Sequence, residues 1–263
     1  MALGDILDGA IKLLRANART MAILVGVFMV PFQFGLAFLQ RNFYGGNGFL
    51  QTLQDPTAAS SQNSTGSVFS VLALSYVVFW VAIPLVCIGA SRVVMASYLG
   101  SELGAKDALR AVVRHLPAAL AATLVVHLAE VVSLLGLGVG IVFAMPLFMM
   151  TAPAMSLEEL GPIAAIRRSV GLARRRYWPT VGIALLSGLL AYILDRVLGL
   201  IPNVVALVIG LHWGWLIVAV SGAVQAFVTV SLISIVATLV YLDARIRQEG
   251  LDIDVMASKA GLR

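Results

Sequence analysis

The segment "SGAVQAFVTVSLISIVATLVYLDARIRQEG" (residues 221–250) joins a long apolar run to a cluster of charged residues. Residues 213–242 contain no Asp, Glu, Lys or Arg, and six charged side chains then follow within twelve positions: Asp243, Arg245, Arg247, Glu249, Asp252 and Asp254. An α-helix rises about 1.5 Å per residue, so about 20 apolar residues cross the hydrocarbon core of a membrane. The segment therefore predicts a transmembrane helix that continues into water.

The composition of the whole chain is that of an integral membrane protein. Sixty per cent of the 263 residues are hydrophobic and 12% are charged, whereas soluble domains carry about 25% charged residues. The single cysteine, Cys87, excludes a disulfide within the chain. The apolar stretches predict an all-α bundle of six transmembrane helices, at roughly 20–39, 68–90, 117–136, 138–155, 179–200 and 215–241. The fourth stretch is short and contains Pro146 and Pro153.

The distribution of positive charge predicts the orientation of the bundle. Sixteen of the eighteen Lys and Arg residues lie before the first span, between the second and third, between the fourth and fifth, or after the sixth. Since positive residues stay in the cytoplasm, both termini are expected there. The run at 203–220 is long enough to span, but a seventh span would place the C-terminal arginines outside. Residues 202–212 are therefore expected to form a short helix lying at the outer face.

Three basic segments on the expected cytoplasmic side have the periodicity of amphipathic helices: 9–19, 107–117 and 164–179. In the third, the expected apolar face is Ile163, Ile166, Val170 and Ala173, opposite Arg167, Arg168, Arg174 and Arg175. Two spans follow each segment. The chain is thus expected to be one membrane domain, built from three repeats of an amphipathic helix plus two spans (1–90, 101–155 and 161–242), with a cytoplasmic tail at 243–263.

The basic residues of these segments have two interpretations. A basic amphipathic helix beside a span lies in the headgroup layer of an anionic inner leaflet, whereas charge that only fixes orientation needs no ligand. The candidates for lipid headgroups or for docking are Arg110, Arg114, Arg167, Arg168, Arg174, Arg175 and Arg176. The tail residues Asp243, Arg245, Arg247 and Glu249 either form a topological lock and helix stop or dock against helix 163–176, with Glu249 and Asp252 facing its arginines.

Several polar residues fall inside the expected spans. His127 lies near the middle of the third span, with Glu130 at i+3 and Thr123 at i−4 on the same face. Arg196 has a depth comparable to that of Glu130, and Gln225 belongs to a polar stripe on the sixth span. Ionisable residues inside a membrane are costly and indicate a function by default: a proton relay, an ion site or a slot for a polar headgroup. The structural alternative is that Glu130 pairs with Arg196 or with His127.

Other site classes find little support in the sequence. His127 and Glu130 spell H-x-x-E, but position 131 is Val, and the remaining histidines, His115 and His212, are expected at opposite membrane faces. A three-ligand catalytic zinc site is therefore not expected. The sequence contains no Gly-rich phosphate loop, nucleophile elbow or paired-cysteine motif. We expect no enzymatic activity, no metal, no cofactor and no nucleic-acid partner.

Two segments resemble a known family. "APAMSLEELGPIAAIRRSVGLARRRYWP" (152–179) has a proline leaving a span, an acidic residue, Ala-x-x-Arg-Ser and an aromatic residue at the next span, and "YLDARIRQEGLD" (241–252) has a matching ending. Both are similar to the membrane domain found with glycerophosphodiester phosphodiesterases and as free-standing proteins, especially in actinobacteria. The resemblance implies a multi-helix protein of the bacterial inner membrane. It implies no activity, because the phosphodiesterase chemistry belongs to a separate barrel domain that this sequence does not contain.

These observations leave two principal functional hypotheses. The first is a non-enzymatic scaffold or accessory subunit that engages anionic inner-leaflet lipid or a protein of the envelope machinery, with a homo-oligomer as a further possibility. The second is a transporter or lipid-moving protein that uses His127, Glu130 and Arg196. Internal repeats favour the second, while the lack of a clear broken helix at mid-depth counts against it. An intramembrane enzyme ranks third.

Overall fold

The computed structural model describes residues 3–41, 65–134 and 140–251. Every regular element in these residues is an α-helix, so the all-α class is confirmed. In chain order the helices are α1 (Leu3–Ala16), α2 (Ala18–Gln40), α5 (Thr65–Tyr98), α6 (Ala105–Leu134), α7 (Gly140–Phe148), α8 (Thr151–Leu157), α9 (Pro162–Arg175), α10 (Tyr177–Ile209) and α11 (Leu211–Glu249).

Five helical segments in the described residues are long and apolar enough to cross a membrane: Ala18–Gln40, Trp80–Tyr98, Ala105–Ser133, Tyr177–Ile209 and Leu211–Glu249. They correspond to the first, second, third, fifth and sixth expected spans. The expected amphipathic segment 107–117 and the third span form one continuous helix, α6. The chain is therefore a helix bundle of the multi-pass membrane class.

The expected fourth span is not a single helix. Residues 140–148 form α7 and residues 151–157 form α8, with a break at Met149 and Met150. Proline lacks the N–H that would bond to the carbonyl four residues earlier, and its ring clashes with that carbonyl. For Pro153 this carbonyl belongs to Met149, which is where the helix breaks.

The expected short helix at 202–212 is also wrong. α10 continues through Pro202 to Ile209, and α11 begins at Leu211. Gly210 between them has φ +89°, a backbone conformation that favours glycine. A Cβ atom on Gly214 would lie only 2.9 Å from the Cβ of Ala206. Two glycines thus allow α10 and α11 to form a closely packed hairpin.

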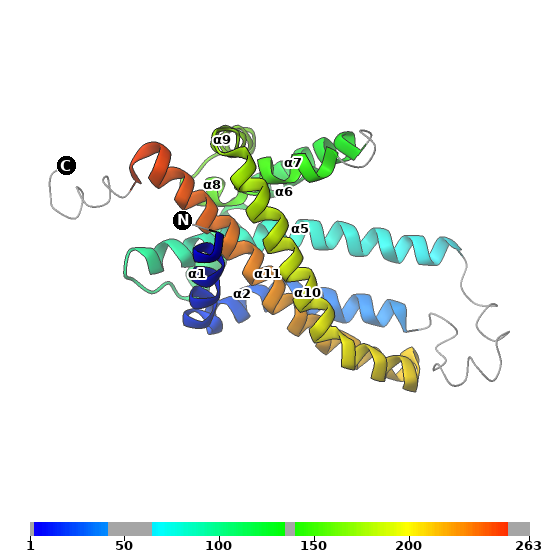
Figure 1. Cartoon of the computed structure of the whole chain (residues 1–263). Coiled ribbons are helices and arrows are strands. Elements are labelled where there is room, and N and C mark those ends of the chain that lie inside the picture. Colours follow the sequence, from blue (N-terminus) through cyan, green and yellow to red (C-terminus); the bar gives the residue numbers. More distant parts are fainter. Residues whose placement is uncertain (1–2, 42–64, 135–139, 252–263) are drawn as a thin grey trace.

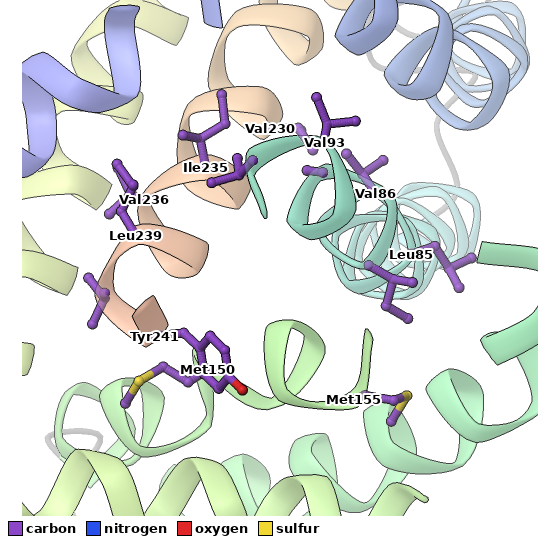
Figure 2. Close-up of a cluster of buried hydrophobic side chains, with 14 of the residues drawn as sticks. Leu85, Val86, Val93, Met150, Met155, Val230, Ile235, Val236, Leu239 and Tyr241 are labelled. Atoms are coloured by element: carbon purple, nitrogen blue, oxygen red, sulfur yellow. The ribbon is translucent and has the colours of Figure 1, made fainter. Parts of the chain in front are cut away.

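Helix α11 runs through the middle of the bundle and contacts α1, α2, α5, α8, α9 and α10 (Figure 1). Nearly every residue from Thr229 to Ala244 is buried, as expected for a helix that is enclosed on all sides. Figure 2 shows this core, where Ile235 and Tyr241 of α11 lie with Val86 of α5 and Met155 of α8. A hydrogen bond of 3.0 Å between the Ser91 and Thr238 hydroxyls joins α5 to α11.

α1, α8, α9 and the C-terminal end of α11 gather at one end of the bundle, and the α10–α11 turn lies at the other (Figure 1). The buried residues of α9 are Ala165, Ser169, Leu172 and Ala173. Of the expected apolar face, Ala173 is buried and Ile166 packs against the core. Ile163 is instead 48% exposed. Small side chains at the contact allow close approach, and the Ser169 hydroxyl donates to the Leu147 carbonyl of α7 at 2.6 Å.

Candidate functional site

A cavity of about 340 Å³ lies among α5, α6, α7, α8, α10 and α11. It is lined mainly by apolar and small side chains, and it is partly open rather than sealed. The break between α7 and α8 forms part of its wall, through Phe148, Met149 and Thr151, while α10 contributes Ala184 and Gly188. The interrupted helix therefore borders this cavity.

The intramembrane residues of α6 line this cavity together. Thr123, His127 and Glu130 all contribute to its wall. His127 Nδ1 lies 2.7 Å from Glu130 Oε2, and Glu130 is only 4% exposed. The indole of Trp80 packs edge-on against the imidazole, with ring centroids 4.4 Å apart. The expected contact of Glu130 is therefore made with His127, within one turn of the same helix.

Three cavity-lining residues carry a buried polar atom that has no hydrogen-bond partner in the described part of the chain: His127 Nε2, Thr151 Oγ1 and Ser234 Oγ. They come from three different helices, α6, α8 and α11. Leaving a buried donor or acceptor without a partner costs about 1–3 kcal/mol, and such atoms call for an explanation. No feature of the sequence singled out Thr151.

Arg196 does not reach Glu130, which corrects the alternative pairing. Its guanidinium lies 2.5 Å from Asp195, and the Arg196 side chain is 65% exposed. Both residues line a second hollow of about 270 Å³ on α10, together with Asn203. The α10 residues that line the cavity with Glu130 are Ala184, Ser187 and Gly188, and Arg196 lies about two turns further along the helix than Gly188. Gln225 is buried elsewhere, where its side-chain amide donates to the Ser221 hydroxyl at 2.6 Å.

A cluster of ion pairs surrounds the turn between α8 and α9, where two adjacent glutamates point to different helices. Glu159 contacts Arg92 of α5 and, from α6, Arg114 at 3.3 Å and His115 at 3.1 Å. Burial opposes ionisation of Glu159, but the hydrogen bond and charge of Arg92, with the charges of His115 and Arg114, outweigh it and lower the pKa of the carboxyl. The Glu159 backbone has φ +53°, so the turn is strained.

Glu158 joins α8 to α9 and α11. Its carboxylate accepts a hydrogen bond from Arg168 at 2.9 Å and from the Tyr241 hydroxyl at 2.6 Å, and it lies 3.5 Å from Arg245. Glu158 is the acidic residue of the family resemblance, whereas neither Glu159 nor Arg92 was a candidate site residue from the sequence. The available signal was a pair of acidic residues directly before a Gly-Pro turn, in a region otherwise rich in arginine.

The C-terminal end of α11 contacts α9. One of the two hypotheses for the charged tail predicted this contact. Arg168 donates to both carboxylate oxygens of Glu249, at 2.5 and 2.6 Å, and Arg176 donates to Asp243 at 3.1 Å. The hydrogen bond to Glu249, assisted by Glu158 and opposed by partial burial, raises the pKa of the Arg168 guanidinium. Asp252 lies outside the described residues.

The helix stop is present at the same place. Gly250 has the left-handed conformation, with φ +67°, and its N–H donates to the carbonyl of Ile246. Arg245 pairs with Glu249 at 3.0 Å and Arg247 with Asp243 at 2.9 Å, both at i,i+4 spacing. The tail therefore combines a capped helix end with ion pairs to α9.

The remaining basic candidates are exposed. Arg110 pairs with Asp107 at 3.2 Å on the same helix. Arg167, Arg174 and Arg175 lie on the exposed side of α9. The arginines of α9 thus divide into those held by carboxylates of the chain and those available to other molecules.

Among the described residues, no group of three or more His, Cys, Asp or Glu side chains is placed to hold a metal ion. No protein-family model matches this chain, and no curated protein or solved structure matches it either. A functional assignment therefore has to come from the cavity and the charged cluster themselves.

Proposed function

We propose that this chain is a non-enzymatic multi-pass protein of a bacterial inner membrane that binds and moves a lipid-like molecule. The observation that supports the proposal is the cavity, whose mainly apolar lining includes His127, Thr151 and Ser234, each with a buried polar atom that has no hydrogen-bond partner among the described residues. Ligand sites combine mostly apolar walls with a few polar groups that orient the ligand. Of the two hypotheses from the sequence, the lipid-moving protein is the better supported.

The interrupted helix supports the same proposal. Sites near the bilayer midplane of transporters are typically formed by discontinuous helices, and the α7–α8 break borders the cavity. The sequence alone offered no such feature. Arg196 has no part in this site, so the proposed ligand contacts come from α6 and α8.

A six-crossing topology with both termini in the cytoplasm belongs to this proposal. Residues 140–157 would cross as the α7–α8 pair, which at about 1.5 Å per residue is close to the thickness of the hydrocarbon core. It is supported by the gathering of the basic segments α1, α9 and the end of α11 at one end of the bundle (Figure 1).

Reporter fusions test the topology. Fusions after Arg114, Arg176 and Arg263 should report the cytoplasm, and a fusion near Asn63 should report the outside. An external C-terminus would mean that the α7–α8 pair does not cross.

Two glycines of α10 offer a matched test of the cavity. A Cβ on Gly188 or on Gly182 would meet nothing within 4 Å, but only Gly188 lines the cavity. Gly188→Phe should fill the cavity, while Gly182→Phe adds the same side chain elsewhere on the helix. The purified chain in lipid nanodiscs would be photolabelled with a methyl hexadecanoate that carries a mid-chain diazirine.

Peptide mass spectrometry would then locate the label. We expect labelling on α6, α7 and α8 in the unmodified protein and in Gly182→Phe, and a several-fold loss on these helices in Gly188→Phe. Equal labelling of the same peptides in all three proteins would refute the proposal.

A second role, as a scaffold that engages anionic lipid, is favoured by the exposed arginines of α9. Each Lys or Arg near an anionic surface contributes about 1 kcal/mol, and Arg167, Arg174 and Arg175 are available for such contacts. Replacing all three with Gln should lower the retention of phosphatidylglycerol in nanodiscs of mixed lipid, measured by native mass spectrometry. Unchanged retention would exclude this role.

A further inference from the structure

The charge balance of the His127–Glu130 pair determines what the cavity presents to a ligand. A net charge in an apolar, membrane-embedded site is costly. Two arrangements of the pair are neutral overall: a protonated His127 with an ionised Glu130, or a neutral His127 whose Nδ1 accepts the proton of a neutral Glu130. The third arrangement, in which neutral His127 donates from Nδ1 to an ionised Glu130, carries a net negative charge.

In both neutral arrangements, His127 Nε2 carries a hydrogen. An imidazolium has N–H groups at both nitrogens, and a neutral imidazole whose Nδ1 is the acceptor has its proton on Nε2. Nε2 is the atom without a protein partner. Because His127 lines the cavity, a ligand that comes within hydrogen-bond distance of Nε2 needs an acceptor.

Thr151 adds a second group that can donate a hydrogen bond to an acceptor on the ligand. Its hydroxyl can donate or accept, has no partner among the described residues and lies in the wall contributed by α8. A carbonyl oxygen has two lone pairs and can accept from two donors at once. It matches one fixed N–H together with one rotatable O–H.

The size of the cavity limits the rest of the ligand. Small-molecule sites in proteins have volumes of about 300–1,000 Å³, and the 340 Å³ of this cavity lies near the lower end of that range. This volume suits one acyl chain and is too small for both chains of a phospholipid.

We infer that the cavity takes a single-chain acyl compound whose carbonyl oxygen accepts hydrogen bonds from His127 Nε2 and the Thr151 hydroxyl. The inference rests on the proposed function and specifies the ligand of the same cavity. A neutral acyl ester fits better than a carboxylate, because it adds no net charge beside Glu130.

Three probes that share a sixteen-carbon chain and a mid-chain diazirine separate the contribution of the polar head group from that of the chain. They are the methyl ester, the alkane without a polar head group, and the primary amine, which is a cationic donor at neutral pH. One or two hydrogen bonds are expected to favour the ester over the alkane and the amine by about 5- to 30-fold in labelling at limiting concentration. Thr151→Val should reduce this preference about five-fold, and Thr151→Ser should retain it. His127→Phe should reduce the preference in the same way.

The outcomes distinguish this inference from the proposed function. If the alkane and the ester label the cavity peptides equally, while Gly188→Phe still blocks both, the cavity binds chains without recognising a carbonyl group and the inference is wrong. If Gly188→Phe changes no labelling by any probe, the proposed function fails with it. A preference for the ester that survives both Thr151→Val and His127→Phe would also overturn the inference.

Discussion

Arg168 is the residue whose replacement tests the charged cluster most directly. Its Nε donates to Glu158 at 2.9 Å, and its two terminal nitrogens donate to Glu249 at 2.5 and 2.6 Å. The side chain is 27% exposed. Arg168→Met keeps the aliphatic stem and removes the charge, so Glu158 and Glu249 would share only Arg245, which lies 3.5 and 3.0 Å from them.

The expected loss of stability lies between two known limits. An exposed ion pair contributes up to about 1 kcal/mol, and breaking a buried pair costs about 3–5 kcal/mol. Because Arg168 is partly buried and binds two carboxylates, we expect Arg168→Met to lower the free energy of unfolding by about 2–3 kcal/mol. Arg168→Lys keeps the charge but loses the planar fork, so its loss should be roughly half as large.

Unfolding by sodium dodecyl sulfate in mixed micelles measures these free energies. In a double-mutant cycle with Glu249→Gln, we expect a coupling energy of about 1–2 kcal/mol. Arg174→Met, an exposed neighbour on α9, is the matched control and should change stability by less than about 0.5 kcal/mol. Additive losses for the Arg168 and Glu249 variants would refute the assignment of this ion pair as a stabilising contact.

Three further predictions follow from other parts of the bundle. The pKa of Glu159 is lowered in the folded state, so its contribution to stability is present above the ordinary carboxyl pKa and is lost as the pH falls through the lowered value. Between pH 7 and pH 3, the thermal denaturation midpoint should therefore fall less steeply for Glu159→Gln than for the unmodified protein. Parallel profiles of the two proteins would contradict this prediction. Gly214→Leu should separate α10 from α11, since even a Cβ would lie 2.9 Å from Ala206, and should cost about 1–3 kcal/mol, whereas Gly182→Ala should cost far less. The purified protein should not hydrolyse glycerophosphodiesters with or without divalent metal, and turnover that disappears in His127→Phe would overturn the non-enzymatic proposal.

Much of the helical architecture could be predicted from the sequence, because it depends on local quantities. The length of an apolar run and the rise per residue locate the five long helices. The i+3 spacing within α6 brings His127 to Glu130, and mixed charges at the end of α11 indicated a protein contact, which Arg168 and Glu249 make. Each of these features can be predicted from one helix alone or from two segments of complementary charge.

Other features were decided only by tertiary structure. Pro153 could have been tolerated inside a span, as prolines often are, and only the structure shows α7 and α8 as separate helices. The partner of Arg196 is Asp195 rather than Glu130, because α10 faces the cavity of Glu130 at Ala184 and Gly188, about two turns or more before Arg196. The relative positions of the helices follow from side-chain packing between distant segments, which no local sequence pattern encodes.

The cavity illustrates the same limit. Thr123, His127 and Glu130 were candidates from their positions on α6, but Thr151 joins them only because α8 packs beside α5 and α6. Likewise, Glu158 and Glu159 are neighbours in sequence, yet they bind arginines of different helices, Arg168 on α9 and Arg92 on α5. The sequence by itself determined where the five long apolar helices form and singled out the polar side chains of α6. The packing of helices from distant parts of the chain decided which of those side chains meet, because a cavity and an ion-pair cluster are properties of several surfaces brought together.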